Sequence, residues 1–330
     1  MKSNTVKRIL KYLLSLALAL VLLYFSFKGV KWEDFVQGLK GCNWGFVALS
    51  MVAGVLACWF RGMRWRELLV PLDPSMSTRT TFNAVNIGYL ANFVLPRIGE
   101  FVRCGVITRN SHKRGNDQAN YEKVLGTVVL ERVWDLFSML LLIIGLLLFT
   151  WQKFGSFFKE EILYKMNISI WWILLLLVLA AAVAIYVVWR WRDSNKLFNK
   201  VWSILSGLFQ GFGTWMKMEG KWRFLFHTAL IWAMYWLMAA AIMWSVPNLE
   251  GFGLADALFL SLVGGLGWIV PVPGGVGAFH YIVSLALLIV YGIPMEVGIV
   301  FATLSHESQA ITMALFGGIS YLDEAIRNRD

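Results

Sequence analysis

The sequence predicts an all-α integral membrane protein, a helical bundle that crosses the bilayer several times. Of its 330 residues, 58% are hydrophobic and 15% are charged, which is far more apolar than a water-soluble domain of this size requires. Several stretches approach the roughly 20 apolar residues that span a hydrocarbon core about 30 Å thick. We therefore expect a single transmembrane domain over residues 1–330.

Eight stretches are apolar enough to enter the membrane. Six of them have the length and continuity of full spans: 9–27, 44–60, 124–149, 170–189, 224–246 and 296–318. Two more, at about 80–100 and 256–292, are interrupted by Pro and Gly, and we interpret them as re-entrant hairpins. Residues 196–223 are too polar to span, and their aromatic residues recur at helical spacing. This pattern favours a helix lying flat on the cytoplasmic interface or, equally, a packed connector.

The distribution of Lys and Arg predicts the orientation. If the N-terminus is cytoplasmic and each hairpin enters and leaves on one side, six of the 30 Lys and Arg lie in outer loops and the other 24 lie on or near the cytoplasmic side. Cytoplasmic loops carry an excess of these residues in membrane proteins. We therefore expect both termini in the cytoplasm, and the net charge of +10 indicates contact with anionic lipid rather than nucleic acid.

This layout predicts two inverted halves, 1–165 and 166–330. The first half runs span, span, hairpin, span, and the second half repeats that order in the opposite orientation. An offset of 175 residues relates three pairs of positions: PRIG at 96–99 with PVPG at 271–274, Glu131 with His306, and Arg132 with Glu307. Many transporters use inverted repeats with broken helices at matching positions to build a midplane site with alternating access.

Both hairpins contain a break that we expect to be non-helical. In lipid, such backbone persists only where it is buried in protein or lines a water-filled cavity. In the first break Pro96 ends one half-helix and Gly99 is expected to permit a tight turn, so that Arg97, Glu100 and Arg103 project from the broken element. The second break contains Pro271, Pro273, Gly274, Gly275 and Gly277. Freed amides at such breaks could bind anions, and simple kinks or close-packing sites are the alternative.

Charged residues also fall inside the span at 124–149. After Asp135, only residues 136–149 are free of charge. At 1.5 Å per residue they cover about 21 Å, which is short of a core about 30 Å thick. Asp135, Arg132 and Glu131 are therefore expected within the cytoplasmic half of the membrane. Arg132 can pair with Asp135, and a structural ion pair is as good an interpretation as a functional site.

The last span carries polar residues near the centre of the bilayer. His306, Glu307 and Gln309 lie in LSHESQA, about 15 Å into the span at 1.5 Å per residue. Residues of this kind at that depth usually face a cavity or a partner. Hydrogen bonding between helices is the alternative, and it suits Gln309 best.

A basic segment follows the span at 44–60. In RGMRWRELL, Arg61 and Arg64 share one helix face. Their ordinary interpretation is anchoring on the cytoplasmic side. The functional one is contact with a lipid phosphate, which the planar fork of Arg binds through paired donors.

Several catalytic classes lack their motifs in this sequence. There is no P-loop, no HExxH zinc motif and no GxSxG, and these are the patterns of ATP-driven motors, zinc proteases and serine hydrolases. The three cysteines are scattered without CxxC spacing, which suggests neither disulfides nor a metal site. We therefore expect no catalytic residue, no metal and no cofactor.

Four motifs in order resemble the lysylphosphatidylglycerol synthase transmembrane-region family, also called the flippase-like domain family. They are Arg-x-x-Arg-Trp after the second span, N-x3-P-x2-GE-x2-R, Glu-Arg-x-x-Asp, and Pro-x-Pro-Gly-Gly-x-Gly. The resemblance covers nearly the whole chain. It implies a bacterial cytoplasmic (inner) membrane protein that moves lipids or lipid-linked molecules between leaflets, as the similar domain of multiple peptide resistance factors does.

The family pattern falls on named positions of this chain. They are Arg61, Arg64, Asn92, Pro96, Gly99, Glu100, Arg103, Glu131, Arg132, Asp135, Pro273, Gly274, Gly275 and Gly277. The chain departs from the pattern at two sites, because His280 stands where many relatives have an acid and His306 where many have Arg. Both departures leave the second half less charged and more pH-sensitive than in those relatives, which argues against a lysyl-lipid substrate.

The sequence thus predicts a lipid flippase or transporter rather than an enzyme. A headgroup would enter near Arg97 and Arg103, pass Glu100, Glu131 and Glu307, and leave beside the break at 271–277. The expected partners are membrane lipids with an anionic or lipid-linked headgroup, with a homo-oligomer or a partner membrane enzyme as further candidates. The alternatives are a membrane-embedded transferase acting on phospholipid or polyprenyl-phosphate headgroups, and a subunit that stabilises another membrane enzyme.

Overall fold

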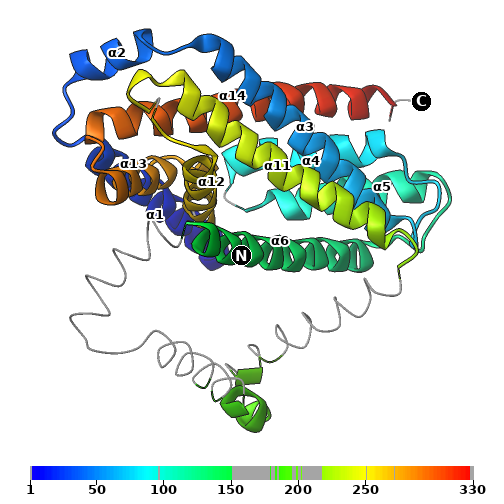
Figure 1. Ribbon diagram of the computed structural model, residues 1–330. Helices are drawn as coiled ribbons and strands as arrows, with labels where there is room; N and C mark the ends of the chain where they lie inside the picture. The colour runs from blue at the N-terminus through cyan, green and yellow to red at the C-terminus, as the bar shows by residue number, and fades with distance from the viewer. Residues whose placement is uncertain are drawn as a thin grey trace. The chain divides into compact units, whose positions relative to one another are not determined.

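The computed structural model describes residues 2–95, 97–150, 179, 183, 186–194, 198–199, 202, 218–249, 251–270 and 272–327. Within these ranges every regular element is a helix, which confirms the all-α prediction (Figure 1). The chain divides into two compact units, one made of Met1–Val129 and Trp222–Asp330 and the other of Leu130–Lys221. Pro96 and Pro271, and most of the residues in the stretches at 170–189 and 196–223, lie outside the described residues.

The first unit contains most of the described helices. In chain order they are α1 (Lys2–Phe27), α2 (Trp32–Lys40), α3 (Trp44–Leu69), α4 (Thr78–Val94), α5 (Gly99–Lys113), the start of α6 (Tyr121–Phe149), α11 (Lys221–Ser245), η2 (Pro247–Leu249), α12 (Leu254–Ile269), η3 (Pro273–Gly275), α13 (Ala278–Tyr291) and α14 (Met295–Arg327). Side-chain caps fix two of the starts. Asn43 Oδ1 accepts from the Gly45 N–H at the start of α3, and Ser77 Oγ accepts from the Thr80 N–H at the start of α4, which satisfies amides that the helices leave unpaired.

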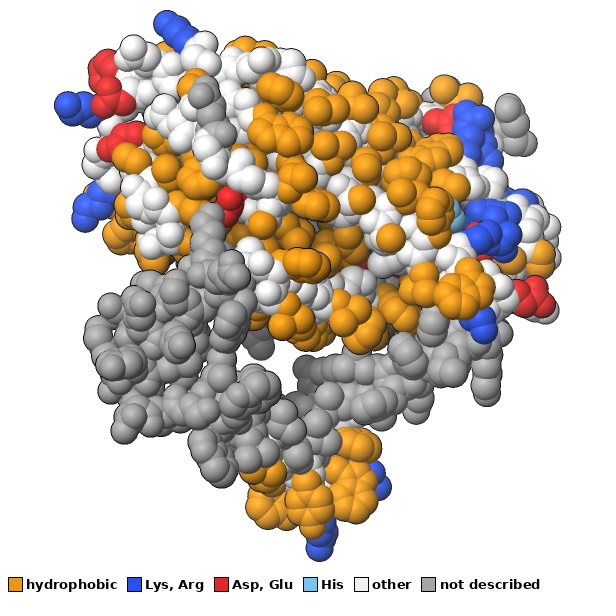
Figure 2. Space-filling model, viewed as in Figure 1, with side chains coloured by type: hydrophobic (Ala, Val, Ile, Leu, Met, Phe, Trp, Pro, Cys, Tyr) orange, Lys and Arg blue, Asp and Glu red, His pale blue; other side chains and the backbone are white. Residues whose placement is uncertain are grey.

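Four helical segments among the described residues are long and apolar enough to cross a membrane: α3, α6, α11 and Pro273–Tyr291. The first three coincide with predicted spans. The predicted spans at 9–27 and 296–318 lie within α1 and α14. Hydrophobic side chains cover the middle of α3 and α11 in the view of Figure 2, while charged side chains gather toward the ends. On α11, Phe226 and Trp222 are 62% and 72% exposed, as expected of a surface that faces lipid.

The two interrupted stretches form helical hairpins, but the first is longer than predicted, because α5 continues to Lys113 whereas the predicted hairpin ended at about residue 100. Asn83 near the start of α4 and Asn110 near the end of α5 both donate to the carboxylate of Glu324, at 3.3 and 2.9 Å. In the second hairpin the Tyr291 hydroxyl, at the end of α13, donates to Asp256 near the start of α12, at 3.0 Å. In each pair the outer ends of the two helices therefore lie together, so the chain reverses direction at the break.

Helix α2 was not predicted, because the sequence analysis placed residues 28–43 in an outer loop. The helix leaves α1 at an angle of 83°. On the buried face of α2, Phe35 packs into the main apolar core together with residues of α11, α12, α13 and α14. Gly38 fits against Val300 of α14, where a Cβ would come within 2.9 Å of Val300 Cγ2. Burial of one apolar face is what gives so short a helix its stability.

Candidate functional site

Three buried arginines occupy the first unit. Arg61 and Arg64 belong to α3 and Arg103 to α5, and their exposed fractions are 5%, 0% and 3%. We call these residues the arginine cluster. An arginine that only anchors a helix at the membrane surface extends its guanidinium into water. The burial of all three therefore contradicts simple anchoring as the explanation for Arg61 and Arg64.

Trp65 contacts one member of this cluster, Arg103. Its side chain is fully buried and donates from Nε1 to Thr127 Oγ1, at 2.9 Å. The guanidinium carbon of Arg103 lies 4.5 Å from the centre of the Trp65 ring, and that of Arg64 lies 5.5 Å from the ring of Phe224. Cation–π contacts of this kind are worth about 2 kcal/mol or more when desolvated. Side chains of α3 thus contact α5, α6 and α11, and two of these contacts involve a buried arginine.

The break between α4 and α5 differs in one respect from the prediction. Gly99 was expected to permit a tight turn, but the residue with a left-handed backbone is Arg97, with φ of 62°. Gly99 is required instead for close packing, because a Cβ there would lie 2.2 Å from the carbonyl oxygen of Gly88 on α4. The Arg97 side chain is exposed, and Glu100 in the first turn of α5 is half-buried.

Asn92 holds the same break together. Its Oδ1 atom accepts from the Gly99 N–H at 2.7 Å, so it satisfies an amide in the first turn of α5. Asn92 is a predicted substrate-binding residue, and the structure gives it a local structural contact. The Cβ atom of Arg103 lies beside Gly88, so the crossing of α4 and α5 also positions the arginine cluster.

The second break depends on three glycines with positive φ: Gly274 (58°), Gly275 (78°) and Gly277 (79°). L-amino acids with a side chain rarely adopt this conformation. A Cβ on Gly277 would lie 2.2 Å from the carbonyl oxygen of Ala19 in α1, and one on Gly274 would lie 3.1 Å from the ring of Phe93. Phe93 lies in the last turn of α4, so the second break contacts the end of the helix that precedes the first break.

His280, His306 and Glu307 come together beside the second break, and we call them the histidine–glutamate cluster. Glu307 Oε1 lies 2.8 Å from His306 Nδ1 and 3.6 Å from His280 Nε2. His306 Nε2 donates to the carbonyl oxygen of Gly274 at 2.8 Å. Both imidazoles are buried, whereas the Glu307 side chain is 47% exposed. The expected protein partner is thus found for His306, which is buried between Glu307 and Gly274.

Three predicted site residues belong to the second unit. Glu131 is fully buried, and Asp135 is mostly buried. Arg132 is exposed and pairs with Asp135, with a distance of 3.5 Å between Nη1 and Oδ2, so the predicted ion pair is confirmed. Gln309 in the first unit donates from Nε2 to Ser50 O on α3, at 3.2 Å, which confirms hydrogen bonding between helices at that position.

Two polar groups escaped the sequence analysis. At the end of α14, Glu324 and Asp323 receive hydrogen bonds from Asn83, Asn110 and Arg79. Between α3 and α4, Asp73 is buried and accepts from Ser111 Oγ at 2.7 Å. Asn83 within α4 was the available signal for the first group, and nothing local distinguishes Asp73 from a solvated loop residue.

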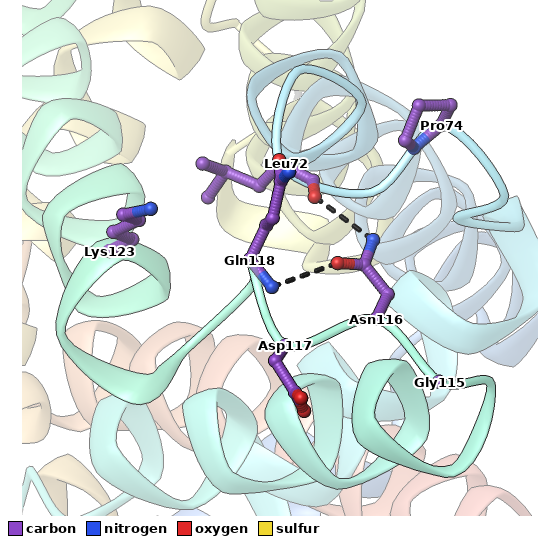
Figure 3. Close-up of a pocket in the computed structure, with 7 residues that line it drawn as sticks. All are labelled: Leu72, Pro74, Gly115, Asn116, Asp117, Gln118 and Lys123. Atoms are coloured by element: carbon purple, nitrogen blue, oxygen red, sulfur yellow. Dashed lines mark hydrogen bonds between the residues drawn. The ribbon is translucent and has the colours of Figure 1, made fainter.

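A shallow pocket lies beside Asp73, between the loop that follows α3 and the loop before α6 (Figure 3). Asn116 crosses between the loops, donating from Nδ2 to Leu72 O at 3.1 Å and accepting from the Gln118 N–H at 2.9 Å. Lys123 lines the pocket opposite these contacts. None of the predicted site residues is among those that line it, and its contacts serve to join the two loops.

Comparison with known proteins gives one match. The model of a family described as "Lysylphosphatidylglycerol synthase TM region" matches residues 12–317, while no curated protein and no solved structure matches the chain. The matched range includes every predicted site residue. The chain therefore belongs to the lysylphosphatidylglycerol synthase transmembrane-region family.

Proposed function

We propose that this protein moves a phospholipid or a lipid-linked headgroup between the leaflets of a bacterial cytoplasmic membrane. The headgroup would travel along a polar path inside the bundle while the acyl chains stay in lipid. A charged group in hydrocarbon costs several kcal/mol or more, so such a path accelerates exchange without any covalent chemistry. On this proposal the protein is a transporter and not an enzyme.

The observation that carries the proposal is the buried arginine cluster. Three guanidinium groups lie in the interior of an apolar bundle, on α3 and α5. Burying charge is costly, and hydrophobic residues would stabilise a purely structural core at lower cost. Guanidinium groups match the geometry of phosphate oxygens, so these side chains are suited to bind a lipid phosphate.

The contacts between the arginine cluster and the second break support a continuous route. Arg103 lies beside Gly88 at the crossing of α4 and α5, Phe93 of α4 contacts Gly274, and Gly274 binds His306. The arginine cluster and the histidine–glutamate cluster are thus linked by a chain of contacts that runs along α4 to the second break. A headgroup that passes between the clusters would move along α4 toward the break between α12 and α13.

An inverted repeat fits this route and remains part of the proposal. Both breaks lie between antiparallel helices, and the matched residues Gly99 and Gly274 each sit at a close packing contact. With cytoplasmic termini and hairpins inserted from opposite faces, each break would open toward a different leaflet. Alternating exposure of the two breaks would then give alternating access.

The direct test is translocation of labelled phosphatidylglycerol by purified protein in liposomes. We expect Arg103→Gln to slow translocation about tenfold or more, because a hydrogen bond to a charged group is worth about 1.5–3 kcal/mol. The matched control is Arg109→Gln, since Arg109 is an exposed arginine on the same helix. Arg103→Lys keeps the charge and the aliphatic stem but loses the paired donors, and its rate should fall between the two.

A transport role fails if the wild type does not exceed empty liposomes, or if Arg103→Gln and Arg109→Gln translocate lipid at the wild-type rate. Each variant is first compared with the wild type in its elution profile and thermal unfolding. A rate loss in a variant that unfolds at the wild-type temperature is then a loss of function rather than of fold.

A further inference from the structure

The histidine–glutamate cluster has the ligand atoms and spacing of a metal site. The offered atoms of His280, His306 and Glu307 all lie within 4.8 Å of one another. In tetrahedral coordination by nitrogen and oxygen at about 2.0–2.1 Å, neighbouring ligand atoms are about 3.3 Å apart. The observed separations from Glu307 Oε1 are 2.8 Å to His306 and 3.6 Å to His280, so side-chain movements of about half an ångström would bring these pairs to that spacing.

His306 is already oriented as metal-binding histidines are. Its Nε2 atom donates to the carbonyl oxygen of Gly274, and a carbonyl accepts only from an N–H. Nε2 therefore carries a proton, and Nδ1 faces Glu307. Metal-binding histidines nearly always donate their second ring nitrogen to a carbonyl or carboxylate in this way. The ring of Trp268 stacks on His306 at 5.2 Å and 21°, which fixes the plane of the imidazole.

His280 supplies an independent indication. Its side chain is 3% exposed, and Nδ1 has no hydrogen-bond partner among the described residues. Its Nε2 atom lies 3.6 Å from Glu307 Oε1, which is too long for a hydrogen bond. Either neutral tautomer leaves a ring nitrogen of a buried side chain unsatisfied, which costs about 1–3 kcal/mol. A cation bound at Nε2 would supply the missing interaction.

We propose that His280 Nε2, His306 Nδ1 and a Glu307 carboxylate oxygen bind a divalent transition-metal ion of the zinc class. Two imidazoles and one carboxylate favour zinc and its neighbours in the transition series over Ca²⁺ or Mg²⁺, which take oxygen ligands. Three protein ligands leave a fourth position for an oxygen ligand such as water, on the side where Glu307 is exposed. Because Gly274 binds His306, the metal would hold α13 and α14 against the second break.

The site is tested with Co²⁺, whose visible absorption reports coordination. The full chain, purified without a histidine tag and stripped with a chelator, is titrated with Co²⁺ in detergent. We expect one Co²⁺ per chain, absorption bands of a four-coordinate ion, and stoichiometric displacement by Zn²⁺. His280→Gln and Glu307→Gln should each weaken binding about tenfold or more, given that even the loss of a supporting contact costs 10–100-fold. His112→Gln, at an exposed histidine, should bind as the wild type does.

Absence of stoichiometric Co²⁺ binding by the wild type would overturn the proposal, and so would unchanged binding by both variants. X-ray absorption spectroscopy of the zinc-loaded wild type tests the site independently of whether any variant folds. It should show a shell of nitrogen and oxygen with two imidazoles, and a sulfur shell would assign the metal to Cys42, Cys58 or Cys104 instead. None of these measurements depends on lipid transport, so the proposed function and the metal site can fail separately.

Discussion

His306 Nε2 donates to the carbonyl oxygen of Gly274 at 2.8 Å, and this bond joins the last helix to the second break. Gly274 lies in a turn that contains three glycines of positive φ, where the carbonyl has no helical partner. The imidazole thus replaces a hydrogen bond that the broken backbone cannot make for itself. The same contact orients the cluster for which we propose metal binding.

Removing that bond should destabilise the fold. His306→Ala leaves a buried carbonyl unsatisfied, so we expect a loss of about 1–3 kcal/mol in the free energy of unfolding, measured by SDS titration in detergent micelles. His306→Gln offers a donor of similar reach and should lose less. His112→Ala, at an exposed histidine, is the control. Equal stability of the wild type and His306→Ala would refute the role assigned to this bond.

Two glycines of α5 allow a matched test of close packing. Gly99→Ala would place a methyl group 2.2 Å from Gly88 O, whereas nothing lies within 4 Å of the position that a Gly105 methyl would take. Overpacking of this kind costs about 1–3 kcal/mol, while Ala in an open helical position gains about 0.5–1 kcal/mol over Gly. Thermal unfolding of the two variants should therefore shift in opposite directions, and a parallel shift would show that the α4–α5 crossing is looser than described.

Asn92 accepts a hydrogen bond from the Gly99 N–H. Two substitutions of Asn92 therefore distinguish a structural role of this residue from a role in lipid binding. Asn92→Asp keeps an oxygen acceptor for the Gly99 N–H, and Asn92→Ala removes it. We expect the Asp variant to retain nearly wild-type stability and the Ala variant to lose about 1–3 kcal/mol. If Asn92 instead contacts lipid, the two variants should be equally stable and differ only in translocation rate.

The environment of Asp73 leads to a prediction of how the free energy of unfolding changes at acidic pH. Burial alone would raise the pKa of Asp73, but hydrogen bonds from Ser75, Ser111 and Arg114 and the charge of Arg114 hold that pKa well below its ordinary value. A carboxylate whose pKa is lower in the folded state contributes stability above its unfolded pKa of about 3.9, and this contribution is lost as the pH falls through the folded pKa. Asp73→Asn should therefore unfold more easily than the wild type at pH 7.

The difference between the two proteins should shrink as the pH falls below about 4. Urea or SDS unfolding across this range measures it. A difference that stays constant from neutral to acidic pH would mean that Asp73 stabilises the fold through packing rather than through its charge. Arg114→Gln provides a second comparison, because it removes the cation and leaves the serine hydroxyls.

The sequence predicted those features that local chemistry decides. Clustered proline and glycine disfavour a continuous helix, so both breaks were found, and apolar runs of span length located α3, α6 and α11. The meeting of His280 with His306 and Glu307 was not predicted, because it depends on how α13 packs on α14. The burial of Arg61 and Arg64 was not predicted either, because the ordinary interpretation of an Arg at the end of a span is anchoring at the membrane surface.

The role of Gly99 was misjudged for a similar reason. Glycine serves both left-handed turns and close approaches, and sequence alone does not separate these uses. The turn instead fell on Arg97, and Gly99 is small because Gly88 of α4 lies against it. Helix α2 was missed because its stability comes from packing against α14 and not from its own nine residues.

The central claim is that buried guanidinium groups carry a lipid phosphate across the membrane. It is tested most directly by comparing two labelled lipids in the same proteoliposomes, phosphatidylglycerol and a diacylglycerol that lacks the phosphate. We predict that the wild type accelerates exchange of the phosphate-bearing lipid only, and that Arg103→Gln removes this acceleration while Arg109→Gln preserves it. Equal acceleration of both lipids, or of neither, would contradict the account.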